Sequence, residues 1–279
     1  IGRLVGKKCN VKKIVYTPHS FFFFKGCPLK NKIIFKTIEM HMAKYTDLLI
    51  CLNNEDYESA LKFKTRGRAI YVPGVGVDLK KFSPITDNFR KEKICKEFNL
   101  NNEVIFVNVG ELSKRKNQKI ILQALSNIKC IKWKLIIVGI GDELEYLKSL
   151  SKELNINNNV IFAGYRNDIA DILSVADFFV FSSIQEGLPV ALMEAMALNV
   201  ICIASKIRGN IDLIKNNVNG LLFENNDVES LVSAINYALD FDLVKKRNIK
   251  LTMHDTIKNF SLENVSTIMI NIYSDFLGE

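Results

Sequence analysis

Short apolar runs alternate along the chain with longer segments in which apolar residues recur every three or four positions. The short runs predict buried β-strands, and the longer segments predict α-helices. Strands are expected at residues 11–16, 48–52, 69–72, 103–109, 133–138, 160–163, 178–181, 200–204 and 220–223. Helices are expected at residues 29–44, 53–64, 116–127, 142–154, 168–174, 189–198, 227–239 and 262–276. This alternation is typical of an α/β fold whose parallel sheets are covered by helices on both faces.

The strands fall into two series, separated by residues 73–88, which contain glycines, Pro84 and polar side chains and are expected to form a linker. The first series reads βαβαβ, which has few strands for a free-standing doubly wound domain. The chain also starts at Ile1 and runs at once into what reads as a helix end followed by a strand. We therefore expect an incomplete first domain. The second series predicts a larger doubly wound sheet, and such sheets bind ligands beyond the carboxyl ends of their strands.

Residues 182–205 combine two glutamates with a helix that is apolar on every side. A helix of this kind is expected to be buried. Pro189 suits its first helical position, and the free N–H groups at that end favour an anion. Glu186 lies in the preceding turn and Glu194 inside the helix, so a ligand with both phosphates and hydroxyl groups would suit the stretch. The alternatives are that Glu186 is a solvated loop acid and Glu194 a structural capping carboxylate.

Two further loops follow strands of the second series. Gly110 precedes Lys114, Arg115 and Lys116, three cations at an expected helix start, where the helix dipole disfavours them. A bound phosphate would explain this placement, and a solvated basic turn is the alternative. Residues 139–142 carry two glycines but lack the third glycine of a dinucleotide fingerprint, which argues against NAD. These glycines are expected to allow a tight turn and a close backbone approach to a ligand.

The formal net charge of +8 favours anionic partners such as nucleotide phosphates or an anionic membrane surface. The basic residues are spread along the chain, so no nucleic-acid partner is expected. No apolar run is long enough to span a membrane, and no secretory signal pattern occurs. The six cysteines form no CxxC pair and no histidine lies at metal-ligand spacing, which indicates a reducing, cytoplasmic compartment and no metal site.

His19 stands at the end of the first expected strand, and four phenylalanines at positions 21–24 follow it. A lone histidine in such a place is more often structural than functional. The phenylalanines are expected to pack in the core or between domains, with a membrane-facing patch as the alternative.

Several segments, in their order along the chain, resemble one family. They are PHSFFFFKG, GVGVDLKKF, VGELSKRKNQ, VGIGDE, FAGYRND and EGLPVALMEAMA. Together they resemble the retaining glycosyltransferases of family 4, which include bacterial capsule, exopolysaccharide and lipopolysaccharide enzymes. The resemblance runs from about Ile14 to Tyr273, and the spacing of Glu186 and Glu194 is its most specific element. It implies a GT-B architecture of two Rossmann-like doubly wound parallel-sheet domains.

On this resemblance, residues 1–85 form a partial acceptor-side domain and residues 86–261 form the nucleotide-sugar-binding domain. Residues 262–279 resemble the helix that crosses back to the first domain. The family's N-terminal domain begins with a strand and a glycine-rich loop that have no match here. About the first third of a full-length enzyme is therefore expected to be absent.

The resemblance also assigns roles to the residues of the stretch 182–205. Glu194 is expected to hold the ribose hydroxyls of a sugar nucleotide, and Glu186 the hydroxyls of the donor sugar. The backbone of Gly187, Leu188 and Val190 is expected to receive the diphosphate.

Residues outside that stretch receive roles as well. Lys116, with Arg115 nearby in the loop that starts at Gly110, would neutralise charge on the leaving diphosphate. Many relatives carry arginine where this chain has Glu111, and Arg115 is expected to substitute for it. Tyr165 and Arg166 fall in the base-binding loop, and His19 lies near the donor sugar.

The implied activity is transfer of a hexosyl group from a nucleotide sugar, on family grounds a UDP-sugar, to a glycan or polyprenyl-linked acceptor. No cofactor is expected, and no Asp-x-Asp metal site is expected, so cations and a helix end would replace a divalent ion. The expected location is the cytoplasm, with a peripheral contact at the inner membrane face. Three rivals stay open: a nucleotide-binding remnant without turnover, a sugar-nucleotide epimerase of the same fold, and a basic membrane-surface scaffold.

Overall fold

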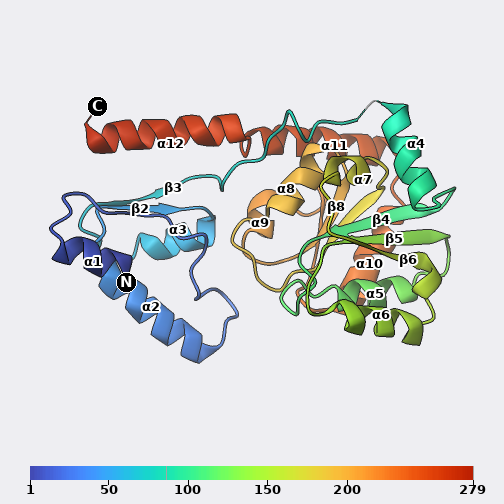
Figure 1. The fold of residues 1–279 in the computed structure, drawn as a ribbon, viewed down its shortest axis with the longest axis horizontal. Coiled ribbons are helices and arrows are strands. Elements are labelled where there is room, and N and C mark those ends of the chain that lie inside the picture. Colours follow the sequence, from blue (N-terminus) through green and yellow to red (C-terminus); the bar gives the residue numbers. More distant parts are fainter. Residues whose placement is uncertain (86, 279) are drawn as a thin grey trace. The chain divides into compact units, whose positions relative to one another are not determined.

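The chain forms two compact units, each built around a parallel β-sheet (Figure 1). The computed structural model describes residues 1–85 and 87–278. The first unit comprises Ile1–Gly76, Glu186–Leu188 and the segment from Asn259 onwards, and the second comprises Val77–Gln185 and Pro189–Lys258. The boundaries expected at residues 85/86 and 261/262 stay predictions. Thr86, at the first of them, and Glu279, at the chain end, lie outside the described residues.

The first unit has a three-stranded sheet in the order β1-β2-β3. Its strands are β1 (Val15–Tyr16), β2 (Leu48–Cys51) and β3 (Arg68–Tyr71), and its helices are α1 (Gly2–Lys8), α2 (Leu29–Ala43), α3 (Asn54–Ala60) and α12 (Leu262–Leu277). The helices expected at residues 29–44 and 262–276 are confirmed to within one residue. The strand expected at residues 11–16 is shorter, because only Val15 and Tyr16 pair with β2 and residues 11–13 are exposed.

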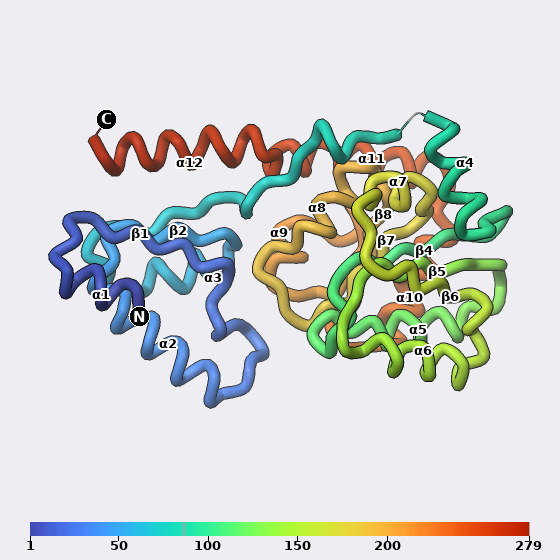
Figure 2. The backbone as a smooth tube through the Cα atoms, in the orientation of Figure 1, coloured from blue at the N-terminus to red at the C-terminus, as the bar shows by residue number. Residues whose placement is uncertain are grey.

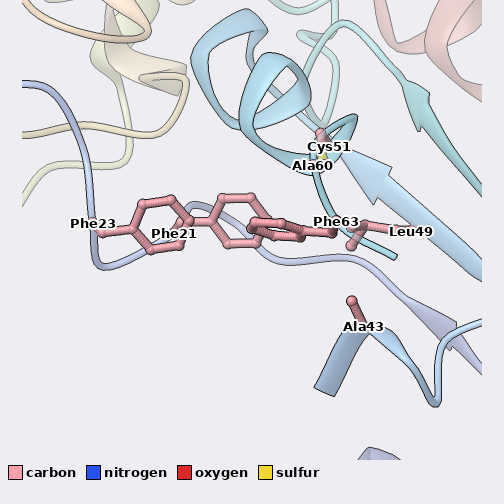
Figure 3. Packing of buried hydrophobic residues seen from close by; sticks show 7 residues of the cluster. All are labelled: Phe21, Phe23, Ala43, Leu49, Cys51, Ala60 and Phe63. Carbon is pink, nitrogen blue, oxygen red and sulfur yellow. The ribbon is translucent and has the colours of Figure 1, made fainter. Parts of the chain in front are cut away.

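Successive side chains of β2 enter two different apolar clusters, as alternation along a strand requires. The first cluster consists of Leu49, Cys51, Phe21, Phe23, Ala43, Ala60 and Phe63 (Figure 3). The second consists of Leu48, Ile50, Leu52, Val72 and, from α12, Val265 and Ile272. Because all four residues of β2 are buried, this strand forms the centre of the first unit.

The segment that follows β1 is held by the start of α3. Asp56 Oδ2 accepts hydrogen bonds from Phe21 N at 3.0 Å and from Asn53 Nδ2 at 2.8 Å. The rings of Phe21 and Phe23 stack with their centroids 5.0 Å apart, whereas Phe22 is 68% exposed. Phe21 and Phe23 are therefore core residues of the first unit, in agreement with the core interpretation.

α2 buries little of its apolar surface. Ile33, Ile34, Ile38 and Met42 recur at helical spacing, but only Met42 is buried and each isoleucine is about half exposed. The helix itself is present where the sequence predicts it. The isoleucines are exposed because α2 enters the first apolar cluster mainly through its last residue, Ala43.

The second unit has a six-stranded parallel sheet in the order β6-β5-β4-β7-β8-β9. Its strands are β4 (Val104–Val109), β5 (Trp133–Val138), β6 (Val160–Gly164), β7 (Phe178–Phe181), β8 (Ile201–Ser205) and β9 (Leu221–Phe223). All six expected strands are confirmed to within about one residue at each end. Figure 2 follows the backbone from β4 outward through β5 to β6, and then through α7 to β7.

Helices cover both faces of this second sheet (Figure 1). They are α4 (Asn88–Glu97), α5 (Lys119–Ser126), α6 (Leu144–Glu153), α7 (Ile169–Ser174), α8 (Val190–Ala197), α9 (Asn210–Leu213), α10 (Val228–Leu239) and α11 (Leu243–Lys258), with the short 3-10 helix η1 (Asn157–Asn159) before β6. α5 packs against α6 and α10, and α8 packs against α11. The covered sheet agrees with the doubly wound arrangement that the apolar strands predict.

α4 was not expected from the sequence, which marks the preceding residues as a linker. Its sequence lacks the apolar periodicity that predicts a helix, and only Ile94 of its ten residues is buried. Its start is defined by Asp87, whose side chain accepts a hydrogen bond from Phe89 N.

Candidate functional site

The strand order of the second unit creates a switch point between β4 and β7. Numbered by their order along the chain, the six strands are arranged 3-2-1-4-5-6 across the sheet. β4 and β7 therefore lie side by side, although three α-helices, one 3-10 helix and two strands separate them in sequence. Ligands of open α/β sheets bind where the loops of two such strands part. The basic loop after β4 and the acidic stretch after β7 both begin at this point.

Hydrogen bonds join these two loops. Ser182 Oγ donates to the backbone carbonyl of Lys116 at 2.9 Å, and Ile184 N donates to the carbonyl of Arg115 at 2.9 Å. In the opposite direction, Arg115 Nη1 donates to the carbonyl of Gln185 at 3.1 Å. The structure thus brings together Arg115 and Lys116 with the first residues of the loop that leads to α8.

The three cations lie in the loop and not in the first helical turn. α5 begins at Lys119, and Asn117 adopts a left-handed conformation with φ 53° just before it. The expected helix start at residue 116 is therefore wrong, because the chain turns at Asn117 first. The dipole of α5 has less influence on these cations than the sequence suggests, since the dipole acts within the first turn.

Lys116 has a defined side-chain position. Its Nζ lies 4.9 Å from the centroid of the Phe181 ring, at the end of β7. A Cβ placed on Gly110 would lie 3.5 Å from Lys116 Cε, so the lysine side chain also runs past the glycine that ends β4. The side chain of Lys116 is therefore half-buried at the switch point.

Arg115 stands beside an acid of its own loop. Its Nη2 lies 3.8 Å from Glu111 Oε2, and both side chains are largely exposed. Glu111 therefore offsets part of the positive charge of this loop.

α8 carries Glu194 among fully buried neighbours. Leu192, Met193, Ala195 and Met196 are each 0% exposed, which confirms the buried helix that the sequence predicts. Burial raises the pKa of the Glu194 carboxyl from 4.5 to about 7, and the positive charge of Lys81 opposes this rise. Glu194 is half-buried, so its carboxyl remains within reach of a ligand.

The amino end of α8 has no side-chain cap. Pro189 occupies the capping position, one residue earlier than expected, and the helix begins at Val190. The first N–H groups of an uncapped helix end form a suitable place for an anion. Val190 is 40% exposed at this end.

Four other expected donor-site residues belong to the first unit. Glu186, Gly187 and Leu188 are half-buried, and His19 is exposed after β1. Their expected roles stay predictions.

The glycines after β5 lie close to the backbone of the loop after β4. A Cβ on Gly139 would lie 1.9 Å from the carbonyl oxygen of Gly110, and Gly139 has φ 146°, which other residues rarely adopt. Leu112 N donates to the carbonyl of Ile140 at 2.9 Å in the same region. The tight turn that the sequence predicts thus supports the basic loop after β4.

Arg166 is held by two carboxylates. Asp168 receives hydrogen bonds from Nε and Nη2 at 2.8 and 2.6 Å, and Glu97 of α4 receives bonds from both terminal nitrogens. These acids raise the pKa of Arg166, and Arg166 in turn lowers the pKa of Asp168. Tyr165, the preceding residue, is 70% exposed. Of the two residues expected to meet a base, Tyr165 is the one presented to solvent.

Within residues 1–85 and 87–278, no group of three or more His, Cys, Asp or Glu side chains could hold a metal ion. One Asp-x-Asp sequence does occur, at Asp240 and Asp242, between α10 and α11. Asp242 Oδ1 accepts a hydrogen bond from Lys245 N at the start of α11, so this residue acts in the helix start. In the same part of the chain, no helix is both long and apolar enough to cross a membrane.

Sequence reasoning did not identify Phe181 and Ser182 as partners of Lys116. Both follow from the pairing of β4 with β7, which the apolar pattern of either strand does not reveal. A partial signal is present, because Phe181 and Ser182 mark the change from an apolar strand to a polar loop at the predicted ligand edge.

Residues 90–250 match the protein family described as "Glycosyl transferases group 1". Two curated relatives are similar over most of the chain. The UDP-Gal:alpha-D-GlcNAc-diphosphoundecaprenol alpha-1,3-galactosyltransferase of Escherichia coli is 35% identical over 84% of this chain and 62% of its own length. The putative glycosyltransferase EpsD of Bacillus subtilis is 33% identical over 77% of this chain and 57% of its own length. The chain thus spans less than two thirds of either relative.

Solved structures show the same fold. The Anabaena protein HepE in complex with UDP and glucose superimposes with a TM-score of 0.85 at 20% identity, over 98% of this chain and 74% of that one. A glycosyltransferase from Rickettsia africae superimposes with a TM-score of 0.83 at 23% identity, over 99% of this chain and 73% of that one. The α/β class, with two parallel sheets and a smaller first unit, agrees with the GT-B architecture expected from the sequence.

Proposed function

Because the chain belongs to the group 1 glycosyl transferases, we propose that it transfers a hexosyl group from a UDP-sugar to a lipid-linked acceptor. The observation that carries this proposal is the hydrogen-bonded junction of the two loops at the β4–β7 switch point. There, a half-buried lysine, Lys116, lies at the ligand edge of the sheet that also carries the amino end of α8.

The identity of the donor is supported by two comparisons. The name of the Escherichia coli relative includes UDP-Gal, and HepE was solved with UDP and glucose. The acceptor class is supported by the diphosphoundecaprenol in the name of the same Escherichia coli relative. A nucleotide sugar also has the phosphates and hydroxyls that cations, a helix end and a carboxylate can bind together.

In the proposed reaction, the bond between the anomeric carbon and the diphosphate oxygen breaks, and its electron pair leaves with the nucleoside diphosphate. The acceptor hydroxyl oxygen forms the new bond on the same face of the sugar, and its proton passes to a phosphate oxygen. The anomeric configuration is therefore retained. Lys116, Arg115 and the N–H groups of α8 stabilise the negative charge that develops on the diphosphate.

The other residues orient the donor in this proposal. Glu194 accepts hydrogen bonds from the ribose hydroxyls, while Glu186 accepts bonds from the hydroxyls of the sugar. The backbone of Gly187 and Leu188 contributes further donors to the diphosphate, and His19 lies near the transferred sugar.

At the base, Tyr165 supplies a stacking surface. Arg166 keeps the base loop in place through Asp168 and Glu97, because both carboxylates already occupy its guanidinium.

Protein cations and N–H groups take the place of a divalent ion in the proposal, so transfer needs no metal and no cofactor. We assign the reaction to the cytoplasmic face of a membrane in cell-surface glycan assembly, since a polyprenyl-linked acceptor resides in lipid. The net charge of +8 favours a peripheral contact with anionic lipid there.

A transfer assay tests the proposal. The chain is incubated with UDP-glucose, UDP-galactose or UDP-N-acetylglucosamine and with a diphosphoundecaprenol-linked sugar, and the product linkage is read by NMR. We expect one UDP-sugar to be transferred with retained configuration and Lys116→Met to lose most of this turnover. A chain that transfers and hydrolyses no UDP-, GDP- or ADP-sugar would contradict the proposal.

A further inference from the structure

Phe181, the last residue of β7, and Ser182, which follows it, both contact Lys116. The ring of Phe181 lies under its ammonium group, with the Nζ atom 4.9 Å from the ring centroid. The hydroxyl of Ser182 donates to its backbone carbonyl at 2.9 Å. One strand end therefore restrains both the main chain and the side chain of this lysine.

The Phe181 ring is itself fixed by the core. It is 1% exposed and stacks on Phe179, with the centroids 5.9 Å apart and the planes inclined by 18°. Aromatic pairs of this kind prefer stacked geometry, so the ring has little freedom to turn. Its negative π face attracts the ammonium group, and this attraction grows where water is excluded, as beside a half-buried lysine.

Gly110, which follows β4, lies beside the side chain of Lys116. A Cβ at this position would lie 3.5 Å from Cε and 3.8 Å from Nζ of Lys116, in ordinary contact with the lysine side chain. The lysine chain thus runs between the end of β4 and the end of β7, the two strands that form the switch point. A long side chain restrained in this way loses less conformational entropy when it meets an anion.

We propose that Phe181 and Ser182 form a lysine seat, which positions the ammonium group of Lys116 for the departing diphosphate of the donor. This inference rests on the proposed function. Phe181 and Ser182 are positioning residues, since they contact the lysine and not the substrate. Because Phe181 is packed in the core, the lysine seat holds one positive charge at a fixed location.

Matched variants distinguish a positioning role of Phe181 and Ser182 from a role in core packing alone. Phe181→Leu removes the π face, while Phe178→Leu removes a similar volume from another buried ring of the same strand, one that stacks on Phe106. Ser182→Ala removes the bond to the lysine carbonyl. Its control is Ser183→Ala, because Ser183 is also fully buried and its hydroxyl has no hydrogen-bond partner among the described residues.

The kinetic readout is kcat and KM for donor turnover. We expect Phe181→Leu and Ser182→Ala to lower kcat about tenfold with little change in KM, because the seat acts on charge that develops in the transition state. Both control variants should remain within about twofold of wild type. In a Lys116→Met background, Phe181→Leu should have no further effect on kcat, as expected when one residue acts through another.

A second readout does not depend on turnover. In protein labelled with ¹³C-lysine, the Cε protons of Lys116 should show an upfield ring-current shift that Phe181→Leu abolishes and Phe178→Leu retains. Lys116→Arg assigns the resonance. An unshifted Lys116 signal in the wild type would overturn the seat whatever the activity of the protein.

The outcomes of the two proposals can be told apart. If the wild type turns over a nucleotide sugar but Phe181→Leu and Phe178→Leu lose activity equally, the lysine seat is refuted and the proposed function stands. If the wild type neither binds nor turns over any nucleotide sugar, the proposed function and the catalytic purpose of the seat both fall.

Discussion

Arg166 donates two parallel hydrogen bonds to Asp168, from Nε to Oδ1 at 2.8 Å and from Nη2 to Oδ2 at 2.6 Å. Paired bonds of this geometry are stronger than single ones, because both groups are charged and planar. The second carboxylate, Glu97, connects the same guanidinium to α4. Arg166 therefore links the loop after β6 to a helix about seventy residues away in sequence.

Arg166→Ala should destabilise the second unit by about 2 kcal/mol, since it leaves two partly buried carboxylates without their partner. Thermal unfolding followed by circular dichroism measures the loss. Lys152→Ala, an exposed position on α6, is the control and should change the free energy of unfolding by less than about 0.5 kcal/mol. An Arg166→Ala protein as stable as wild type would show that the network contributes nothing.

Tyr165→Ala should weaken the binding of a nucleotide sugar about tenfold, whereas Tyr165→Phe should bind as the wild type does. Stacking of a base on an aromatic ring contributes about 1–3 kcal/mol, and phenylalanine retains the ring. Because Tyr165 is 70% exposed, neither variant should alter stability by more than about 0.5 kcal/mol. Equal affinity of both variants for the donor would exclude stacking at this position.

The site was predictable from the sequence to different extents. The stretch 182–205 shows its buried helix and its acids directly, because an apolar segment that contains a carboxylate is unusual at any tertiary position. The role of Arg166 was not predictable in full, since Glu97 meets it only through the packing of α4 against α7. The contact between Phe181 and Lys116 likewise depends on the order of strands, which the apolar pattern leaves open.

The fold was likewise predictable from the sequence only in part. Strands such as β5 and β7 match their predicted bounds, because a short run of apolar residues bounded by polar loops is typical of a buried strand. The exposure of the isoleucines of α2 and the existence of α4 were not predicted. In both helices, burial depends on a few tertiary contacts, at Ala43 and Ile94, and not on a continuous apolar stripe.

Glu111→Gln should strengthen the binding of a nucleoside diphosphate a few-fold at low salt. The carboxylate lies 3.8 Å from Arg115, so its removal leaves the basic loop with one more uncompensated positive charge. The gain should disappear near 0.5 M salt, where exposed charges are screened. Stability should change by less than about 1 kcal/mol, as is usual for exposed ion pairs. Unchanged affinity at every salt concentration would contradict this account of the loop.

Glu194→Gln should stabilise the protein above neutral pH and leave its stability unchanged at acidic pH. The folded-state pKa of Glu194 is raised from 4.5 to about 7 by burial, so folding favours the protonated form. The protonated carboxyl therefore contributes to the stability of the folded protein. This contribution is fully present below about pH 4.5 and is lost as the pH rises through 7. Above pH 7 the gain from the substitution should approach about 3 kcal/mol at most.

Denaturant unfolding at several pH values measures this effect. Glu153→Gln, at an exposed position on α6, is the control and should follow the wild type at each pH. A stability difference between Glu194→Gln and wild type that does not vary between pH 5 and 8 would contradict the prediction.

Calorimetric titration of the wild type and Glu194→Gln with a panel of nucleotide sugars at several pH values tests the central claim most directly. The pyrophosphate diester of a nucleotide sugar does not titrate between pH 5 and 8, so a change in affinity reports on the protein. We predict that the wild type binds one UDP-sugar, that its affinity falls up to about tenfold per pH unit below 7 as Glu194 becomes protonated, and that Glu194→Gln binds weakly at every pH. Binding of the donor by Glu194→Gln as tight as by the wild type at pH 8, or no binding of any nucleotide sugar by the wild type, would contradict the account.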